Sequence, residues 1–124
     1  MNIKALIFGS RGLVGSSVVR RFNNSNLFTE VVESSRKDTN LFLFEETNAT
    51  IKSVKPDIII NAAAKVGGIL ANNTFRTEFI IENLKINLNI LESCIDNNDI
   101  KIINLGSSCI YPLNAKNPIN ENSF

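Results

Sequence analysis

With 124 residues, 44% of them apolar and 20% charged, the chain is long enough for one globular domain around a single core. A formal charge of +1 argues against binding to nucleic acid or an anionic membrane, and neither a signal peptide nor a run of membrane-spanning length is present. Two cysteines and no histidine exclude a disulfide framework and a zinc site, so we expect a cytoplasmic, metal-free protein.

The N-terminal part of the chain predicts strands alternating with a helix. Residues 3–8 form a short apolar run typical of a buried strand. From 13 to 22, apolar residues recur at helical spacing and are followed by a polar, asparagine-rich segment. Further strands are predicted at 30–34 and at 41–44.

The same alternation continues toward the C-terminus. A short helix is predicted at 49–54, ending before Pro56, and a strand at 57–61 around three isoleucines. Apolar residues then define a long helix from about 74 to 97. The last predicted strand spans 100–105.

Strands that alternate with helices imply right-handed crossovers and a parallel sheet covered on both faces. We therefore predict an α/β fold, a Rossmann-like doubly wound parallel sheet of about five strands. The composition after Pro112 is rich in asparagine, proline and lysine, which indicates a loop over 113–124. No further strand or helix follows, so we expect a truncated sheet.

Three glycines lie where the first strand ends and the first helix begins. Gly9 would permit a tight turn, Gly12 would let a pyrophosphate approach the backbone, and Gly15 would let the helix pack closely on the strand. The N–H groups at the helix N-terminus would then face the phosphates. A purely structural turn is the alternative. The G-x-x-G-x-x-G spacing is the form found in short-chain dehydrogenase/reductase proteins.

The residues at the end of the second predicted strand indicate which dinucleotide is bound. A carboxylate at its end would bind the 2′-hydroxyl of NAD, and a cation would accommodate the 2′-phosphate of NADP. Arg36 and Lys37 follow this strand, and Arg11 lies in the glycine turn, which favours NADP. Glu33 counts against NADP, although it precedes the strand end. Alternatively, Arg36 and Lys37 are only solvated loop charges.

Two later segments resemble a known family. The sequence N-A-A-A-K-V-G-G-I-L-A-N-N covers 61–73, and L-G-S-S-C-I-Y-P covers 105–112. Both are similar to the GDP-L-fucose synthase family, extended short-chain dehydrogenase/reductases that epimerise and then reduce GDP-4-keto-6-deoxymannose with NADPH. The resemblance runs from about Ile3 to Pro118. It implies a GDP-linked keto-deoxyhexose as substrate.

The positions that match the family, together with their neighbours in the sequence, form the expected cofactor-binding site. The resemblance implies that Arg11 and Arg36 contact the 2′-phosphate and that the three alanines after the third strand form a close-packed turn under the cofactor. The expected NADP-binding residues are Gly9, Ser10, Arg11, Gly12, Leu13, Val14, Gly15, Arg36, Asn40, Leu41, Ala62, Ala63, Ala64, Asn83, Leu105 and Gly106.

The resemblance also implies two catalytic residues. Ser107 matches a serine that hydrogen-bonds the reacting sugar oxygen, and such a hydroxyl can donate to a carbonyl that becomes an alkoxide. Cys109 matches a cysteine assigned as an acid/base, which would exchange a proton beside the ketone. Without the resemblance, a turn with a buried thiol would be the simpler interpretation. Cys94, on the long helix, is expected to be a small core residue.

The Tyr-x-x-x-Lys pair that the family needs for reduction is not in this sequence. The one tyrosine is Tyr111, and Ala115 stands where the lysine would be. We therefore expect residues 1–124 to be the N-terminal part of an NADP-binding Rossmann domain without its C-terminal substrate domain, inactive alone. It would be a truncated gene product, half of a split enzyme or an engineered fragment. Its expected partner is a second copy, through the long helix, or the missing C-terminal half.

Two other functions remain open. One is another nucleotide-sugar enzyme of the same family, a 4-epimerase or a dehydratase, which Cys109 and Lys65 argue against. The other is a non-catalytic NADP-binding module, which the missing tyrosine–lysine pair would equally suit.

Overall fold

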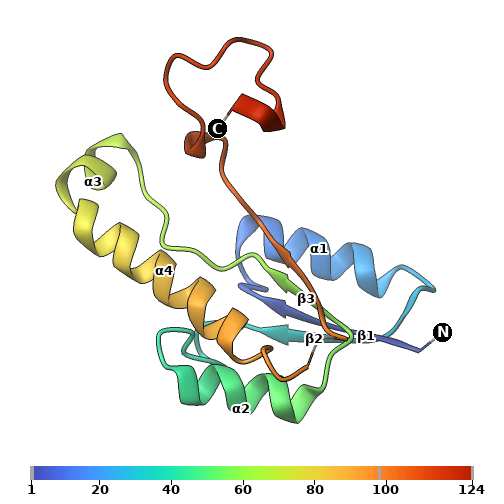
Figure 1. Cartoon of the computed structure of the whole chain (residues 1–124). Coiled ribbons are helices and arrows are strands. Elements are labelled where there is room, and N and C mark those ends of the chain that lie inside the picture. The colour runs from blue at the N-terminus through green and yellow to red at the C-terminus, as the bar shows by residue number, and fades with distance from the viewer. Residues whose placement is uncertain (1, 98, 124) are drawn as a thin grey trace.

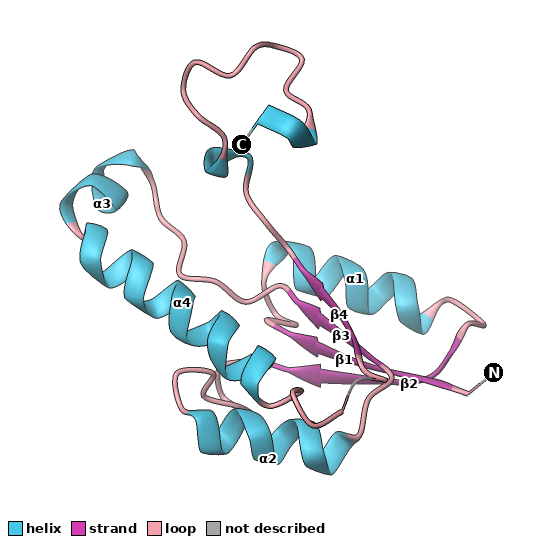
Figure 2. Ribbon diagram, in the orientation of Figure 1, coloured by secondary structure: helices cyan, strands magenta, loops and turns pink. Residues whose placement is uncertain are grey.

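The computed structural model describes residues 2–97 and 99–123, and its centre is a parallel sheet. The strands are β1 (Ile3–Phe8), β2 (Phe28–Ser34), β3 (Ile58–Asn61) and β4 (Lys101–Asn104). Their order is β2-β1-β3-β4, and every neighbouring pair is parallel. Figure 2 shows the strands side by side with a common direction, so all carboxyl ends meet at one edge.

Helices cover both faces of this sheet. The helices are α1 (Leu13–Asn23), α2 (Phe44–Val54), α3 (Ile69–Thr74) and α4 (Arg76–Glu92). Helix α1 packs on one face, and α2 and α4 pack together on the other (Figure 1). The predicted Rossmann-like, doubly wound α/β fold is therefore confirmed.

Side chains along β1 and β3 point alternately to the two faces of the sheet, so the core consists of two clusters, one on each face. Leu6, Phe8 and Ile59 point to the α2–α4 side, where they form one buried cluster with side chains of both helices. Ile7 and Ile60 point to the other side and pack against α1. The four residues 5–8 of β1 are fully buried, because this strand has a neighbour on each edge and helices on each face.

The predicted strand at 41–44 is wrong, and the described residues form a four-stranded sheet rather than one of about five strands. The Leu43 N–H donates to Asn40 O at 3.0 Å, which closes a turn, and α2 begins at Phe44. Leu41 and Phe42 still bury apolar surface against the core, but they do so from a loop. An apolar run alone could not separate these two outcomes.

The other elements differ from prediction mainly at their ends. Helix α2 ends at Val54 as predicted, with Lys55 in a left-handed conformation (φ 50°), but it starts five residues earlier than expected. Helix α4 ends at Glu92, five residues before the predicted end, and is preceded by the unpredicted α3. Helix α3 has only six residues and none of them is buried, so the sequence carries no apolar helix face from which α3 could be predicted.

After β4 the chain leaves the sheet. Residues 105–123 extend away from the layers and contain two short 3₁₀ segments, η1 (Ser108–Ile110) and η2 (Glu121–Ser123) (Figure 1). Strand β4 is an edge strand, and Ile103 is 40% exposed. Within residues 2–97 and 99–123, no helix is both long and apolar enough to cross a membrane.

Candidate functional site

A pocket of about 690 Å³ lies at the carboxyl ends of β1, β2 and β3. The segments that follow these three strands line it, together with Ile86 of α4. In open parallel sheets, ligands bind in this crevice, outside the carboxyl ends of the strands. The topology therefore places the pocket where a ligand is expected.

The first wall of the pocket is the glycine turn between β1 and α1. Gly9 has φ +74°, and a Cβ atom there would lie 2.7 Å from backbone atoms of Ala62 and Ala63. The Gly12 N–H donates to Gly9 O at 2.9 Å, and the Ser10 N–H donates to Ser34 O at 3.2 Å. The first of these bonds closes the turn itself. The second joins the turn to the end of β2, and the close approach of Gly9 to Ala62 and Ala63 joins it to the segment after β3.

The other two glycines of the turn differ in what surrounds them. A Cβ atom on Gly15 would lie 2.1 Å from Gly9 O, so glycine is needed there for the turn itself to close. On Gly12 the nearest atom would be Gly9 O at 3.3 Å, and the remaining space is open. Gly12 lines the pocket, so its missing side chain leaves room for a ligand rather than for the protein.

Helix α1 presents its N-terminus at this wall. Its N-cap is Gly12, no side chain caps it, and its first turn contains no acidic residue. The N–H groups of a first helical turn have no intrahelical acceptor and carry partial positive charge. This end of α1 can therefore accept an anionic group from the pocket.

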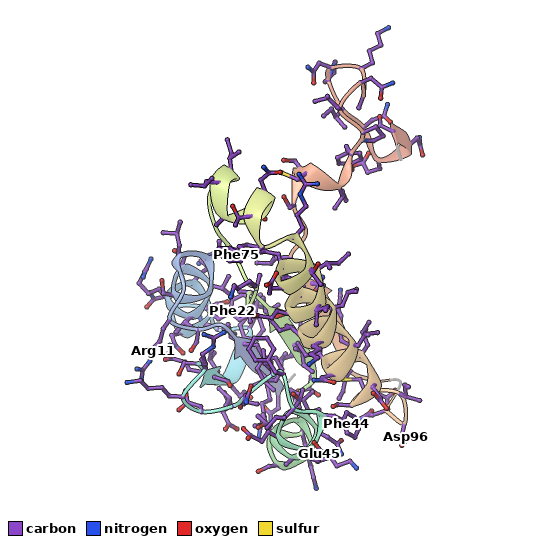
Figure 3. The ribbon with its side chains drawn as sticks, turned by 90° about the vertical axis from the view of Figure 1, so that its left-hand side faces the viewer. Arg11, Phe22, Phe44, Glu45, Phe75 and Asp96 are labelled. Carbon is purple, nitrogen blue, oxygen red and sulfur yellow. The ribbon has the colours of Figure 1, made fainter. Side chains whose placement is uncertain are left out.

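The second wall is the loop after β2, which brings cations to the rim. Arg36 and Lys37 of this loop line the pocket, and so does Arg11 of the neighbouring glycine turn. The Arg36 guanidinium lies over the Phe42 ring, 5.3 Å from its centroid, which restrains the side chain. Figure 3 shows Arg11 extending outward from the ribbon beside this loop.

One carboxylate lies among these cations. Asp38 Oδ2 accepts hydrogen bonds from the Ser35 hydroxyl at 2.5 Å and the Ser35 N–H at 2.8 Å. These bonds lower the pKa of Asp38 below its usual range, and the charges of Arg11 and Lys37 lower it further. Asp38 is therefore ionised at neutral pH.

The third wall is the segment after β3, and buried amides fix its path. The Asn61 side chain donates to Asn104 Oδ1 at 2.6 Å and to Asn87 Oδ1 at 3.2 Å, and it accepts from the Ala63 N–H at 3.1 Å. Asn61 is 3% exposed. It ties the alanine turn to α4 and to the end of β4.

Asn83 of α4 holds the next part of that segment. Its side chain accepts from the Lys65 N–H at 2.9 Å and donates to Lys65 O at 3.0 Å. The Lys65 ammonium pairs with Glu82 at 3.2 Å and lies near the Phe79 ring. Asn83 itself does not line the pocket. Its side chain contacts the protein backbone instead.

Most expected cofactor-binding residues surround this one pocket. Those lining it are Gly9, Arg11, Gly12, Leu13, Val14, Arg36, Asn40, Leu41, Ala62, Ala63 and Ala64. Ser10 and Gly15 are buried beneath the turn, and Leu105 and Gly106 are exposed beyond β4, outside the lining. The lining also includes residues outside the expected cofactor-binding set: Phe8, Ser34, Ser35, Lys37, Thr39, Phe42, Lys65, Val66 and Ile86. Phe42 fell in the wrongly predicted strand, and Ile86 looked like any apolar residue of α4.

The two expected catalytic residues lie elsewhere in the described structure. Ser107 and Cys109 are exposed, in and just before η1, and neither lines the pocket. The Ser107 hydroxyl accepts from the Cys109 N–H at 3.2 Å. Cys94, in contrast, is buried in the core cluster, as expected, and burial raises the pKa of its thiol.

Known proteins are similar to this chain over nearly its whole length. The sequence model of the NAD dependent epimerase/dehydratase family matches residues 5–124. GDP-L-fucose synthase 1 of Arabidopsis thaliana is 41% identical over 121 residues, 98% of this chain and 37% of that protein.

Solved structures of similar proteins agree with the observed fold. A GDP-D-glycero-L-gluco-heptose synthase from Campylobacter jejuni, solved in the presence of NADPH, has a TM-score of 0.89 at 32% identity over 98% of this chain and 35% of that one. A GDP-L-fucose synthetase from Naegleria fowleri, bound to NADP, has a TM-score of 0.83 at 27% identity, covering 98% and 36%. The chain thus spans little more than a third of these relatives.

Proposed function

Because this chain belongs to the NAD dependent epimerase/dehydratase family, we propose that its pocket binds NADP. The observation that carries the proposal is the meeting of the glycine turn with Arg11 and Arg36 around one pocket. Relatives solved with NADP or NADPH support the choice of cofactor. Residues 1–124 would then be the N-terminal part of an NADP-binding domain.

The pyrophosphate would lie against the N-terminus of α1. The open space at Gly12 allows an oxygen to approach the backbone, and the uncapped helix end supplies N–H donors and partial positive charge. The adenosine 2′-phosphate would lie between Arg11 and Arg36. Arginine suits this position because its planar fork can bind a phosphate through two parallel hydrogen bonds.

Titration with NADPH and NADH tests the proposal. We expect the chain to bind NADPH more tightly than NADH, and Arg36→Ala to lose roughly tenfold in NADPH affinity with little change for NADH. Arg21→Ala is the matched control, since Arg21 is an exposed arginine in the last turn of α1. Equal affinity of the unmodified chain for both dinucleotides would refute the assignment to NADP.

The reaction proposed for the whole enzyme is 3,5-epimerisation and NADPH-dependent 4-keto reduction of a GDP-linked keto-deoxyhexose. Relatives named for GDP-L-fucose or GDP-heptose synthesis support this substrate class. The Ser107 hydroxyl would donate to the 4-keto oxygen as it gains negative charge. The Cys109 thiol would exchange a proton at the adjacent carbon. Both side chains are exposed, which leaves them accessible to such a substrate.

The isolated chain should not complete this reaction, because its sequence has no Tyr-x-x-x-Lys pair to protonate the reduced sugar. A steady-state assay with keto-sugar and NADPH tests this, and turnover above background would contradict it. The missing pair equally suits a non-catalytic NADP-binding module. Co-expression of this chain with a C-terminal segment that contains the pair would separate the two. A catalytic half predicts turnover that Ser107→Ala and Cys109→Ala lower, and a non-catalytic module predicts no turnover.

We also propose a homodimer through α4. Ile80, Leu84, Leu88 and Leu91 recur every three or four residues along the helix, and each is more than half exposed. Such a stripe is typical of a helix that packs on another helix. Sedimentation equilibrium should show a dimer that Leu88→Glu dissociates, while Leu27→Glu, at an exposed loop leucine, leaves it intact.

A further inference from the structure

The loop after β2 is a turn closed by hydrogen bonds in both directions. The Ser35 N–H and hydroxyl both donate to the Asp38 carboxylate, at 2.8 and 2.5 Å. In return, the Asp38 N–H donates to Ser35 O at 3.0 Å. The two residues between them, Arg36 and Lys37, therefore form the apex, and both line the pocket.

Both ends of this turn are anchored independently of Asp38. Before it, Ser34 O accepts from the Ser10 N–H at 3.2 Å, which ties the end of β2 to the glycine turn. After it, the buried Thr39 hydroxyl accepts from the Ser34 hydroxyl at 2.9 Å and lies 3.0 Å from the Thr50 hydroxyl of α2. Loss of the Asp38 carboxylate should thus loosen the apex without unfolding its supports.

The charge of Asp38 makes these bonds strong but places an anion near the proposed phosphate site. Hydrogen bonds that involve an ionised acceptor are about twice as strong as neutral ones. The same negative charge would repel a bound phosphate, but Asp38 is exposed, so solvent and salt screen that repulsion. The geometric role of Asp38 therefore outweighs its electrostatic cost.

We propose that Asp38 is the positioning residue that sets coenzyme preference, because its carboxylate closes the turn that presents Arg36 and Lys37 to the 2′-phosphate. The inference rests on the proposed NADP site. It adds to that site an acidic residue, whereas the side chains proposed to bind the phosphate are cationic. Asp38 itself does not line the pocket. It acts through the N–H and the hydroxyl of Ser35.

Three variants separate this role from a general effect on the fold. Asp38→Ala removes both acceptor bonds, and NADPH affinity should fall about tenfold while NADH affinity changes less than about twofold. Asp38→Asn keeps an oxygen that can accept both bonds, although without the charge, and should restore part of the preference. Ser35→Ala removes the hydroxyl that donates to Asp38 and accepts from the Lys37 N–H at 3.3 Å, but it keeps the bond from the Ser35 N–H to Asp38. It should produce a loss in the same direction.

Asp96→Ala is the matched control, because Asp96 is an exposed acid beyond the end of α4, on the side of the molecule opposite Arg11 in Figure 3. Affinities for NADPH and NADH are measured by fluorescence titration on all four variants, with circular dichroism to compare their folds. A purely structural role would weaken both dinucleotides alike, whereas the positioning role changes their ratio.

The result that overturns the inference is an unchanged NADPH-to-NADH ratio in Asp38→Ala, or an equal loss of ratio in Asp38→Asn. If Asp38→Ala does not fold, the ratio in Ser35→Ala decides the question in the same way. Failure of the proposed function looks different, because the unmodified chain would then show no preference for NADPH at all.

Discussion

Gly12→Ala should separate cofactor binding from folding. Gly12 has φ −73° and ψ 171°, a conformation that alanine adopts without strain. The new Cβ atom would meet only Gly9 O, at 3.3 Å, and would otherwise occupy open space at the pocket. The methyl group would therefore disturb a ligand more than it disturbs the protein.

The two effects differ in size. Alanine in place of glycine at an N-cap costs about 0.5–1 kcal/mol, and the stiffer unfolded chain offsets about 0.4–1 kcal/mol of that. The free energy of unfolding should thus change by less than about 1 kcal/mol. A methyl group that holds the pyrophosphate off the backbone removes charge-assisted hydrogen bonds of about 1.5–3 kcal/mol, or roughly 10- to 100-fold in affinity.

Fluorescence titration with NADPH and urea unfolding measure these two quantities on the same sample. Gly68→Ala is the matched control: Gly68 is the N-cap of α3, with φ −71° and ψ 176°, and its Cβ would meet no atom within 4 Å. It should share the small change in stability and keep full NADPH affinity. Unchanged NADPH binding by Gly12→Ala would refute the reasoning, as would an equal loss of binding in the control.

Three further changes test other parts of the structure. Gly15→Ala should lower the free energy of unfolding in urea by about 3 kcal/mol, since its Cβ would overlap a backbone oxygen; a loss below 1 kcal/mol would contradict the close contact. Asn83→Ala removes both bonds to Lys65 and should cost about 1–3 kcal/mol, with faster hydrogen exchange of the Lys65 amide. Burial raises the pKa of Cys94 and reduces its thiolate fraction, so iodoacetamide near neutral pH should alkylate exposed Cys109 roughly tenfold faster or more. Equal rates would show that Cys94 is accessible.

The sequence predicted the sheet well because its strands carry local signals. The run at 3–8 is apolar except for Lys4, and the observed β1 has the predicted ends, because a central strand is largely buried on both faces. The apolar run at 41–44 looks similar but folds as a turn and the start of α2. A local hydrogen bond from the Asn40 N–H to the Glu46 carboxylate at 2.9 Å stabilises the turn. The side chain of Asn89 on α4 also donates to Leu41 O at 2.8 Å, and this contact depends on the tertiary fold.

The candidate site was only partly predictable. A glycine turn and a cation after β2 have fixed positions relative to strand ends, so Gly12 and Arg36 could be assigned from spacing and both line the pocket. Asn83 was expected at the cofactor, yet its contacts are with the backbone of Lys65. The role of Asp38 could not be predicted, because it depends on a hydrogen bond across a turn.

The most direct test of the central claim is to map NADPH onto the chain by NMR. At 13.7 kDa, the ¹⁵N-labelled protein is small enough for its amide signals to be followed during a titration. We expect the largest shifts at Gly12 and Leu13, at 35–37 and at 62–65, which surround the pocket. Shifts confined to other surfaces, or no shifts at saturating NADPH, would contradict the account.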